Sequence, residues 1–168
     1  MEKNSDMQNV TFKGMTEHVF LEQCEKLMAS YAEDMTQAGL AAKEDALKLA
    51  QNTFTALLPK GFHTPGVDFY AVFNSENEEI GNVFLMERQP GVALIMWIEI
   101  KEQFRRRGYG RSVLARIENE LAAKNYGMIV LNVFEFNKGA KGLYESCGYT
   151  VFNVENGAIA MKKSLKDK

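Results

Sequence analysis

The sequence has few of the residues that hold metals or form disulfides. It contains two cysteines and two histidines among 168 residues. Cys24 and Cys147 form no CxxC pair, and His18 and His63 are far apart in the chain. Because protein metal sites usually combine several such ligands at short spacing, no metal site is expected. The two cysteines are expected to be reduced thiols in or near the core.

A long apolar run and an excess of one charge are also missing. The longest apolar run, Val92–Ile98, is far shorter than the roughly 20 residues that a membrane helix needs. Residues 1–8 are polar and lack the apolar core of a signal peptide, so we expect a flexible leader and a cytoplasmic protein with no membrane partner. The formal net charge of -2 argues against a nucleic-acid partner.

What is present is the composition of an ordinary globular protein. Hydrophobic residues make up 46% of the chain and charged residues 25%. The length suits one full-sized hydrophobic core, and no repeat or low-complexity segment divides the chain. We therefore expect a single domain over residues 1–168.

The first part of the chain predicts two helices. Apolar residues recur at helical spacing after Thr16, which is a suitable N-cap, and Gly39 is a natural stop. A second helix is expected over residues 43–58, ended by Pro59. Ahead of them, Val10–Met15 predicts a short strand or an extended arm.

The rest of the chain alternates between strands and helices. Strands are expected over residues 69–73, 79–87, 92–100, 128–133, 149–153 and 158–162, and helices over 108–124 and 137–146. The strand–helix–strand unit at 92–133 implies a right-handed crossover and parallel pairing, whereas the hairpins imply antiparallel pairing. The expected fold class is α/β, with a mixed, mostly antiparallel sheet of six to seven strands and helices on both faces.

A glycine-containing helix start follows directly after the strand at 92–100. Gly108 and Gly110 leave room for a ligand, and the first N–H groups of a helix attract anions. Four arginines surround this turn: Arg105, Arg106, Arg107 and Arg111. The turn is either a phosphate site or a helix start with a solvated basic patch. The GxxxxGK[ST] loop is absent, and the GxGxxG fingerprint would need glycine at Val113.

A second segment, Asn137–Tyr149, decides between these readings. Together, Arg105-x-x-Gly108-x-Gly110 and Asn137-x-x-Ala140-x-x-Leu143-Tyr144-x-x-x-Gly148-Tyr149 resemble the two motifs of the GNAT acetyltransferase superfamily, [RQ]xxGxG/A and NxxAxxLYxxxGF/Y. The resemblance is strong over residues 66–162. The N-terminal helices look like those of small bacterial GNAT proteins of unassigned substrate. One departure is Arg106, where many members have glycine.

The resemblance implies acetyl-CoA as acyl donor, bound in a V-shaped gap where the parallel strands at 92–100 and 128–133 splay apart. Residues 66–162 would form the acetyl-CoA-binding core, and residues 16–61 the acceptor side. Asn137 matches a position that reaches the cofactor arm, although it could serve only as a helix cap. The implied cofactor-binding residues are Ile98, Ile100, Arg105, Arg106, Arg107, Gly108, Tyr109, Gly110, Arg111, Asn137 and Tyr144.

Acyl transfer to an amine needs an acid, a base and an oxyanion donor. Tyr144 matches the family position of the acid that protonates the thiolate, or is a core tyrosine. A backbone N–H near Ile98 is the simplest oxyanion donor. Strict alternation puts Leu94, Met96, Ile98 and Ile100 on one face, and Ile95, Trp97 and Glu99 on the other.

On that alternation, Glu99 faces the N-terminal helices and the acceptor groove. It is therefore the candidate general base, or else a carboxylate that binds a cationic acceptor or pairs with an arginine. Trp97 and Tyr31 are candidate groove walls or core residues.

The resulting hypothesis is an acetyl-CoA-dependent N-acetyltransferase. It would move the acetyl group directly to a primary amine of a small molecule or peptide in a ternary complex. The alternative is an acyl-CoA-binding sensor or interaction module without catalysis. No motif specifies the amine, and a homodimer through edge strands is an expectation by analogy alone.

Overall fold

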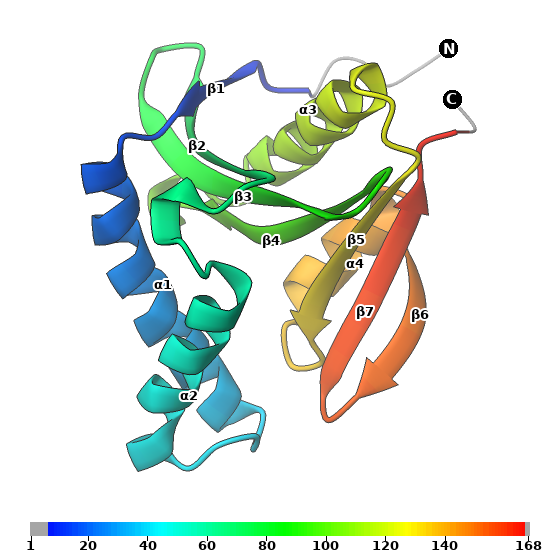
Figure 1. Ribbon diagram of the computed structural model, residues 1–168. Coiled ribbons are helices and arrows are strands. Elements are labelled where there is room, and N and C mark those ends of the chain that lie inside the picture. The colour runs from blue at the N-terminus through cyan, green and yellow to red at the C-terminus, as the bar shows by residue number, and fades with distance from the viewer. Residues whose placement is uncertain (1–6, 167–168) are drawn as a thin grey trace.

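The structure is a computed structural model in which residues 7–166 are described (Figure 1). These residues form a seven-stranded sheet with helices on both faces, as expected for the fold class. The elements are β1 Val10–Gly14, α1 Glu17–Gln37, α2 Lys43–Leu57, η1 Gly61–His63, β2 Val67–Asn74, β3 Glu79–Gln89, β4 Val92–Ile100, η2 Glu102–Phe104, α3 Tyr109–Ala123, β5 Met128–Phe134, α4 Lys138–Ser146, β6 Thr150–Glu155 and β7 Ala158–Ser164.

The sheet has the strand order β1-β2-β3-β4-β5-β7-β6. Every neighbouring pair is antiparallel except β4 and β5. The parallel pairing begins at Val92 opposite Met128 and ends at Ile95 opposite Leu131, although both strands continue beyond those residues. The predicted parallel pair is therefore confirmed, and its two strands are paired over only part of their length.

A β-bulge in β4 overturns the strict alternation expected for that strand. Leu85 of β3 lies opposite Ile95 and Phe84 lies opposite Trp97, so Met96 has no partner on β3. The extra residue shifts the side-chain period by one. Ile95 consequently shares the α3 side of the sheet with Ile98 and Ile100, whereas Met96 packs with Trp97 on the α1 side.

Two layers of helices cover the sheet. Helices α3 and α4 pack on one face, where the main core includes Val113, Ile117 and Tyr144. Helices α1 and α2 lie on the other face (Figure 1), where Phe20 and Leu27 of α1 contact Phe84 of the sheet. Helices α1 and α2 lie beside the part of the sheet where β4 diverges from β5. A cleft is found at this point.

The N-terminal helices begin and end where local signals predicted. The Thr16 hydroxyl caps α1 by accepting a hydrogen bond from the Val19 N–H (3.3 Å), and Gly39 adopts a φ of 73° just after the helix. The expected flexible leader falls on residues 1–6, which lie outside the described residues, and on Met7 and Gln8. Within residues 7–166, no helix is long and apolar enough to cross a membrane.

A buried ion pair joins α3 to strand β7. Glu118 of α3 is 4% exposed, and its carboxylate lies 2.8 Å from the Lys163 ammonium of β7. Lys163 also donates to the Cys147 carbonyl at the end of α4 (2.6 Å). One lysine therefore fixes α3 and α4 relative to the sheet. Cys24 is buried, which raises the pKa of its thiol to about 11, and Cys147 is half-buried; both thiols are free.

Gly81 on β3 offers a test of how closely β3 and β4 approach. A Cβ at this position would lie 1.9 Å from the Glu99 carbonyl oxygen, which is backbone and cannot turn away. We expect Gly81→Ala to lower the free energy of unfolding by about 3 kcal/mol because the strands must separate. Urea unfolding followed by circular dichroism measures this. The matched variant is Gly14→Ala, where an added Cβ meets nothing within 4 Å, and equal losses in both variants would contradict the close approach.

Candidate active site

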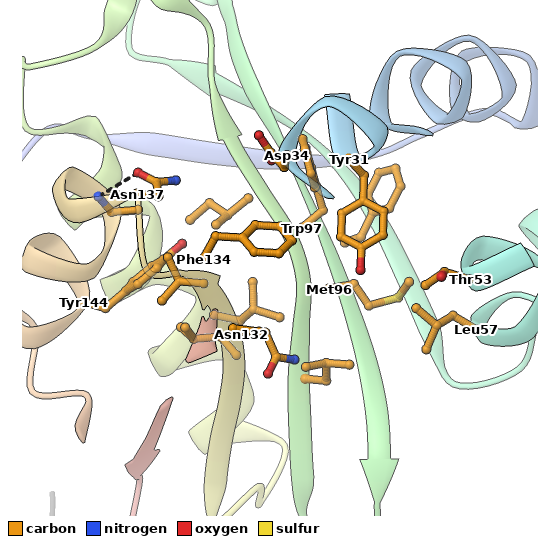
Figure 2. A pocket seen from close by; sticks show the side chains of 18 of the residues that line it. Tyr31, Asp34, Thr53, Leu57, Met96, Trp97, Asn132, Phe134, Asn137 and Tyr144 are labelled. Atoms are coloured by element: carbon orange, nitrogen blue, oxygen red, sulfur yellow. Dashed lines mark hydrogen bonds between the residues drawn. The ribbon is translucent and has the colours of Figure 1, made fainter. Parts of the chain in front are cut away.

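A cleft of about 370 Å³ opens where β4 and β5 diverge (Figure 2). Its walls come from α1, α2, β4, β5 and α4. Asn137 and Tyr144 of α4 lie on one side of it, and Thr53 and Leu57 of α2 lie on the opposite side (Figure 2). One continuous cavity therefore connects the second sequence motif to the N-terminal helices.

The floor of the cleft is the edge of β4 that β5 no longer covers. Pairing between the strands stops at Ile95, and Met96, Trp97 and Ile98 line the cavity beyond it. Backbone groups along this edge are available to a ligand. Of the two predicted contact residues, Ile98 lines the cleft. The carbonyl of Ile100 accepts a hydrogen bond from the Arg105 side chain at 2.7 Å.

The start of α3 has the geometry of an anion site. Gly108 is the N-cap with a φ of 84°, and the first intrahelical hydrogen bond runs from the Ser112 N–H to the Gly108 carbonyl (3.2 Å). The N–H groups of Tyr109, Gly110 and Arg111 precede that bond and have no acceptor within the helix. Free N–H groups at a helix N-terminus attract phosphate. A diphosphate therefore fits this turn.

The four arginines around the turn make different contacts in the structure. Arg105, Arg106 and Arg107 are exposed, and Arg106 itself has a φ of 59°. Arg111 instead reaches α4, where its guanidinium donates to the Ser146 hydroxyl at 2.8 Å. The basic charge around the turn comes mainly from the first three, and Arg111 fastens α3 to α4.

Gln8 and Ser112 support the phosphate turn, and sequence reasoning missed both. The Ser112 hydroxyl donates to the Gly108 carbonyl (3.1 Å) and accepts from the Gln8 backbone N–H (2.9 Å). The Gln8 side chain donates to the Arg107 carbonyl at 3.2 Å. The contacts span about a hundred residues of sequence, so no local signal could have revealed them.

The two motifs meet where α3 packs on α4. A Cβ added at Gly110 would lie 2.9 Å from a methyl carbon of Leu143, so the second motif glycine permits close packing. Asn137 caps α4 by accepting a hydrogen bond from the Ala140 N–H (3.3 Å) and also lines the cleft (Figure 2). The two roles considered for Asn137 are therefore compatible.

Tyr144 combines core packing with a place in the cleft wall. It is 8% exposed, and its ring meets Tyr149 edge-on with centroids 6.0 Å apart. Burial raises the pKa of its hydroxyl to about 12. Among residues 7–166, no side chain or backbone group pairs with that hydroxyl by a hydrogen bond. The group is a protonated donor across the neutral pH range.

Glu99 lies on the α1 side of the sheet, as the sequence predicted. It sits directly opposite Asn82 of β3, whose amide donates to Gln23 of α1 at 3.5 Å. Glu99 is half-buried and is not part of the cleft lining. A proton could therefore pass between Glu99 and a molecule in the cleft only across an intervening group such as water.

The α1 side of the cleft holds one carboxylate that sequence reasoning missed. Asp34 lines the cleft from α1, one turn after Tyr31, and burial raises the pKa of its carboxyl, with the like charge of Glu33 adding to the effect. Burial also raises the pKa of Tyr31, and the charge of Asp34 adds to this shift. The i, i+3 spacing from Tyr31 was a usable signal, but the cleft wall could not be located without the tertiary structure.

In the part of the chain that the structure describes, no group of three or more His, Cys, Asp or Glu side chains could hold a metal ion.

Comparisons of the sequence and of the structure with known proteins all find acetyltransferases. A model of the acetyltransferase (GNAT) family matches residues 27–149. The chain is 30% identical over 138 residues to the uncharacterized N-acetyltransferase YycN of Bacillus subtilis (strain 168), a match that covers 80% of this chain and 85% of the relative. The crystal structure of YycN has a TM-score of 0.83 at 27% identity and covers 88% of this chain and 96% of that chain.

Two more distant structures share the fold. PaiA N-acetyltransferase of Thermoplasma acidophilum, in complex with coenzyme A, has a TM-score of 0.69 at 17% identity, covering 93% of this chain and 99% of that chain. Spermidine N-acetyltransferase of Vibrio cholerae, in complex with CoA and spermine, has a TM-score of 0.65 at 19% identity, covering 96% and 97%. The family match spans most of the sheet and both motifs, and the chain therefore belongs to the acetyltransferase (GNAT) family.

Proposed function

We propose that this protein transfers the acetyl group of acetyl-CoA directly to a primary amine of a small molecule or peptide. The observation that carries the proposal is the divergence of β4 from β5 directly before an anion-binding helix start. The free strand edge suits the amide groups of a pantetheine arm, and the start of α3 suits the diphosphate. The coenzyme A complexes of PaiA and of spermidine N-acetyltransferase support the same assignment.

Residues in the cleft and beside it would have separate roles in this reaction. Bound acetyl-CoA supplies an activated acyl group as a thioester, whose C–S bond breaks as a C–N bond forms. The backbone N–H groups near Ile98 stabilise negative charge on the carbonyl oxygen. Tyr144 gives its proton to the departing sulfur. Glu99 accepts, through a water, the proton that the acceptor's ammonium must lose before the neutral amine attacks the thioester carbonyl.

Direct transfer is favoured because the described part of the cleft offers no thiol for an acyl-enzyme route. Among residues 7–166, no cysteine lines the cleft: Cys24 is buried in the α1 layer, and Cys147 lies at the end of α4. The amine and acetyl-CoA would therefore be bound together. We assign residues 66–162 to acetyl-CoA binding and residues 16–61 to the acceptor side.

Gly108→Asp tests the diphosphate site. The added carboxylate would face the diphosphate and repel it, so we expect acetyl-CoA to bind at least about tenfold more weakly by calorimetry. Gly91→Asp is a matched control, because Gly91 also has a positive φ (80°) and open space around it, but lies in the β3–β4 turn. Equal affinities in the two variants would remove the start of α3 from the binding site.

Tyr144→Phe tests the acid. We expect kcat to fall about a hundredfold while acetyl-CoA affinity is retained. Because the pKa of Tyr144 is about 12, its hydroxyl keeps its proton at pH 8–10, so wild-type kcat should not decline over that range through loss of this acid. Stopped-time assays of the released coenzyme A thiol measure the fall in kcat of the variant and the pH dependence of wild-type kcat. Tyr70→Phe on β2 removes a hydroxyl away from the cleft, and similar losses in both variants would exclude a specific role for Tyr144.

Glu99→Gln tests the base. An alkyl amine with a pKa near ~10.4 needs help to lose its proton at neutral pH and less help in alkali. We expect kcat/KM to fall about tenfold at pH 7, with most of the deficit recovered at about pH 9.5. The control is Glu76→Gln in the exposed β2–β3 turn. A deficit of the same size at both pH values would indicate a role in binding or structure instead.

A further inference from the structure

The acceptor end of the cleft has a distinctive chemistry. Among the described residues that line the cleft, Asp34 is the only charged side chain. The remaining wall on that side is mostly aromatic and aliphatic. Tyr31 of α1 and Trp97 of β4 belong to it (Figure 2), as does Phe54 of α2. Such a wall favours a ligand with an apolar body and a single positive charge.

We propose that the acceptor is a monoamine with an apolar or aromatic body, which first binds as an ammonium at Asp34 with its body between the aromatic side chains of α1, α2 and β4, and which loses its proton before the neutral amine reaches the thioester. This inference rests on the proposed acetyl transfer. It adds the chemical class of the acceptor, and it names Asp34 as the residue that selects it.

The charge at Asp34 is available to a ligand. Its carboxylate forms no hydrogen bond or ion pair with another side chain among residues 7–166, although neighbouring helices carry several ion pairs. Asp34 is half-buried in a mostly apolar wall. A partly desolvated carboxylate attracts an ammonium more strongly than one in bulk water. The ligand would supply the missing partner.

The aromatic side chains of the cleft form a connected group. The Tyr31 ring lies 6.0 Å from the Phe134 ring and 6.4 Å from the Phe54 ring, measured between centroids. Trp97 contributes to the same wall. Ring faces attract ammonium groups and pack well against apolar or aromatic bodies. The residues therefore recognise both parts of an amphipathic monoamine.

The same wall disfavours a polyamine. Each additional ammonium would have to leave water, and the cleft lining offers no second carboxylate for it. Glu99, the nearest acid considered for catalysis, is not part of the lining. A relative with this fold is a spermidine N-acetyltransferase. The single carboxylate predicts a different preference in this chain.

Trp97 allows a direct test, because it is the only tryptophan in the chain and lies in the cleft wall. The CoA-loaded protein is titrated with 2-phenylethylamine, with the neutral 2-phenylethanol and with spermidine while Trp97 fluorescence is recorded. We expect the amine to bind at least about tenfold more tightly than either of the others. The titration is repeated without CoA, so that the cleft is tested whether or not CoA binds.

Asp34→Asn separates the charge from the shape of the side chain. We expect it to weaken 2-phenylethylamine binding about tenfold and to leave 2-phenylethanol binding unchanged. Glu33→Gln is the matched control, because it removes the same charge from the next residue of α1, which is exposed. Unchanged binding of the alcohol and of CoA would show that the variant is folded.

Three results would overturn the inference: equal affinity for the amine and the alcohol, tighter binding of spermidine, or equal losses in the Asp34 and Glu33 variants. None of these would affect the proposed acetyl transfer if CoA still binds. Failure of the wild-type protein to bind CoA by calorimetry would instead contradict the proposed function.

Discussion

The functional geometry of this protein depends on the point at which β4 stops pairing with β5. The parallel ladder ends at Ile95, and a bulge at Met96 follows immediately. Because a β-strand edge must pair with something or face water, the divergence leaves backbone groups of β4 open along the cleft. The bulge places Ile95 in the α3 core with Ile98 and Ile100, whereas Met96 packs with Trp97 on the α1 side.

The cleft and the turn beside it have opposite electrostatic characters. Free N–H groups of α3 and the exposed arginines 105–107 favour an anion, whereas Asp34 favours a cation on the side of α1. The middle of the cleft is mostly apolar, and Tyr144 is buried in its wall, so the phenol keeps its proton.

Contacts between distant parts of the chain hold these groups in place. Lys163 fixes α3 and the end of α4 through Glu118 and the Cys147 carbonyl, and Arg111 fastens the two helices at Ser146. Buried charged groups are costly unless they are paired, so these pairings specify how the helices sit on the sheet. The first turn of α3 is fastened to the end of α4 by the Arg111 contact.

The sequence by itself determined the helices, the strands, the parallel pair and both motifs, because caps, glycines and apolar periodicity act over a few residues. It also placed Glu99 on the side of α1. It did not reveal the bulge at Met96, which depends on how β3 pairs with β4, and the faces assigned to Leu94, Ile95 and Met96 were wrong for that reason. Only the tertiary structure brought Asp34 into the cleft and Gln8 to the phosphate turn, since packing joins these residues to partners far away in the chain.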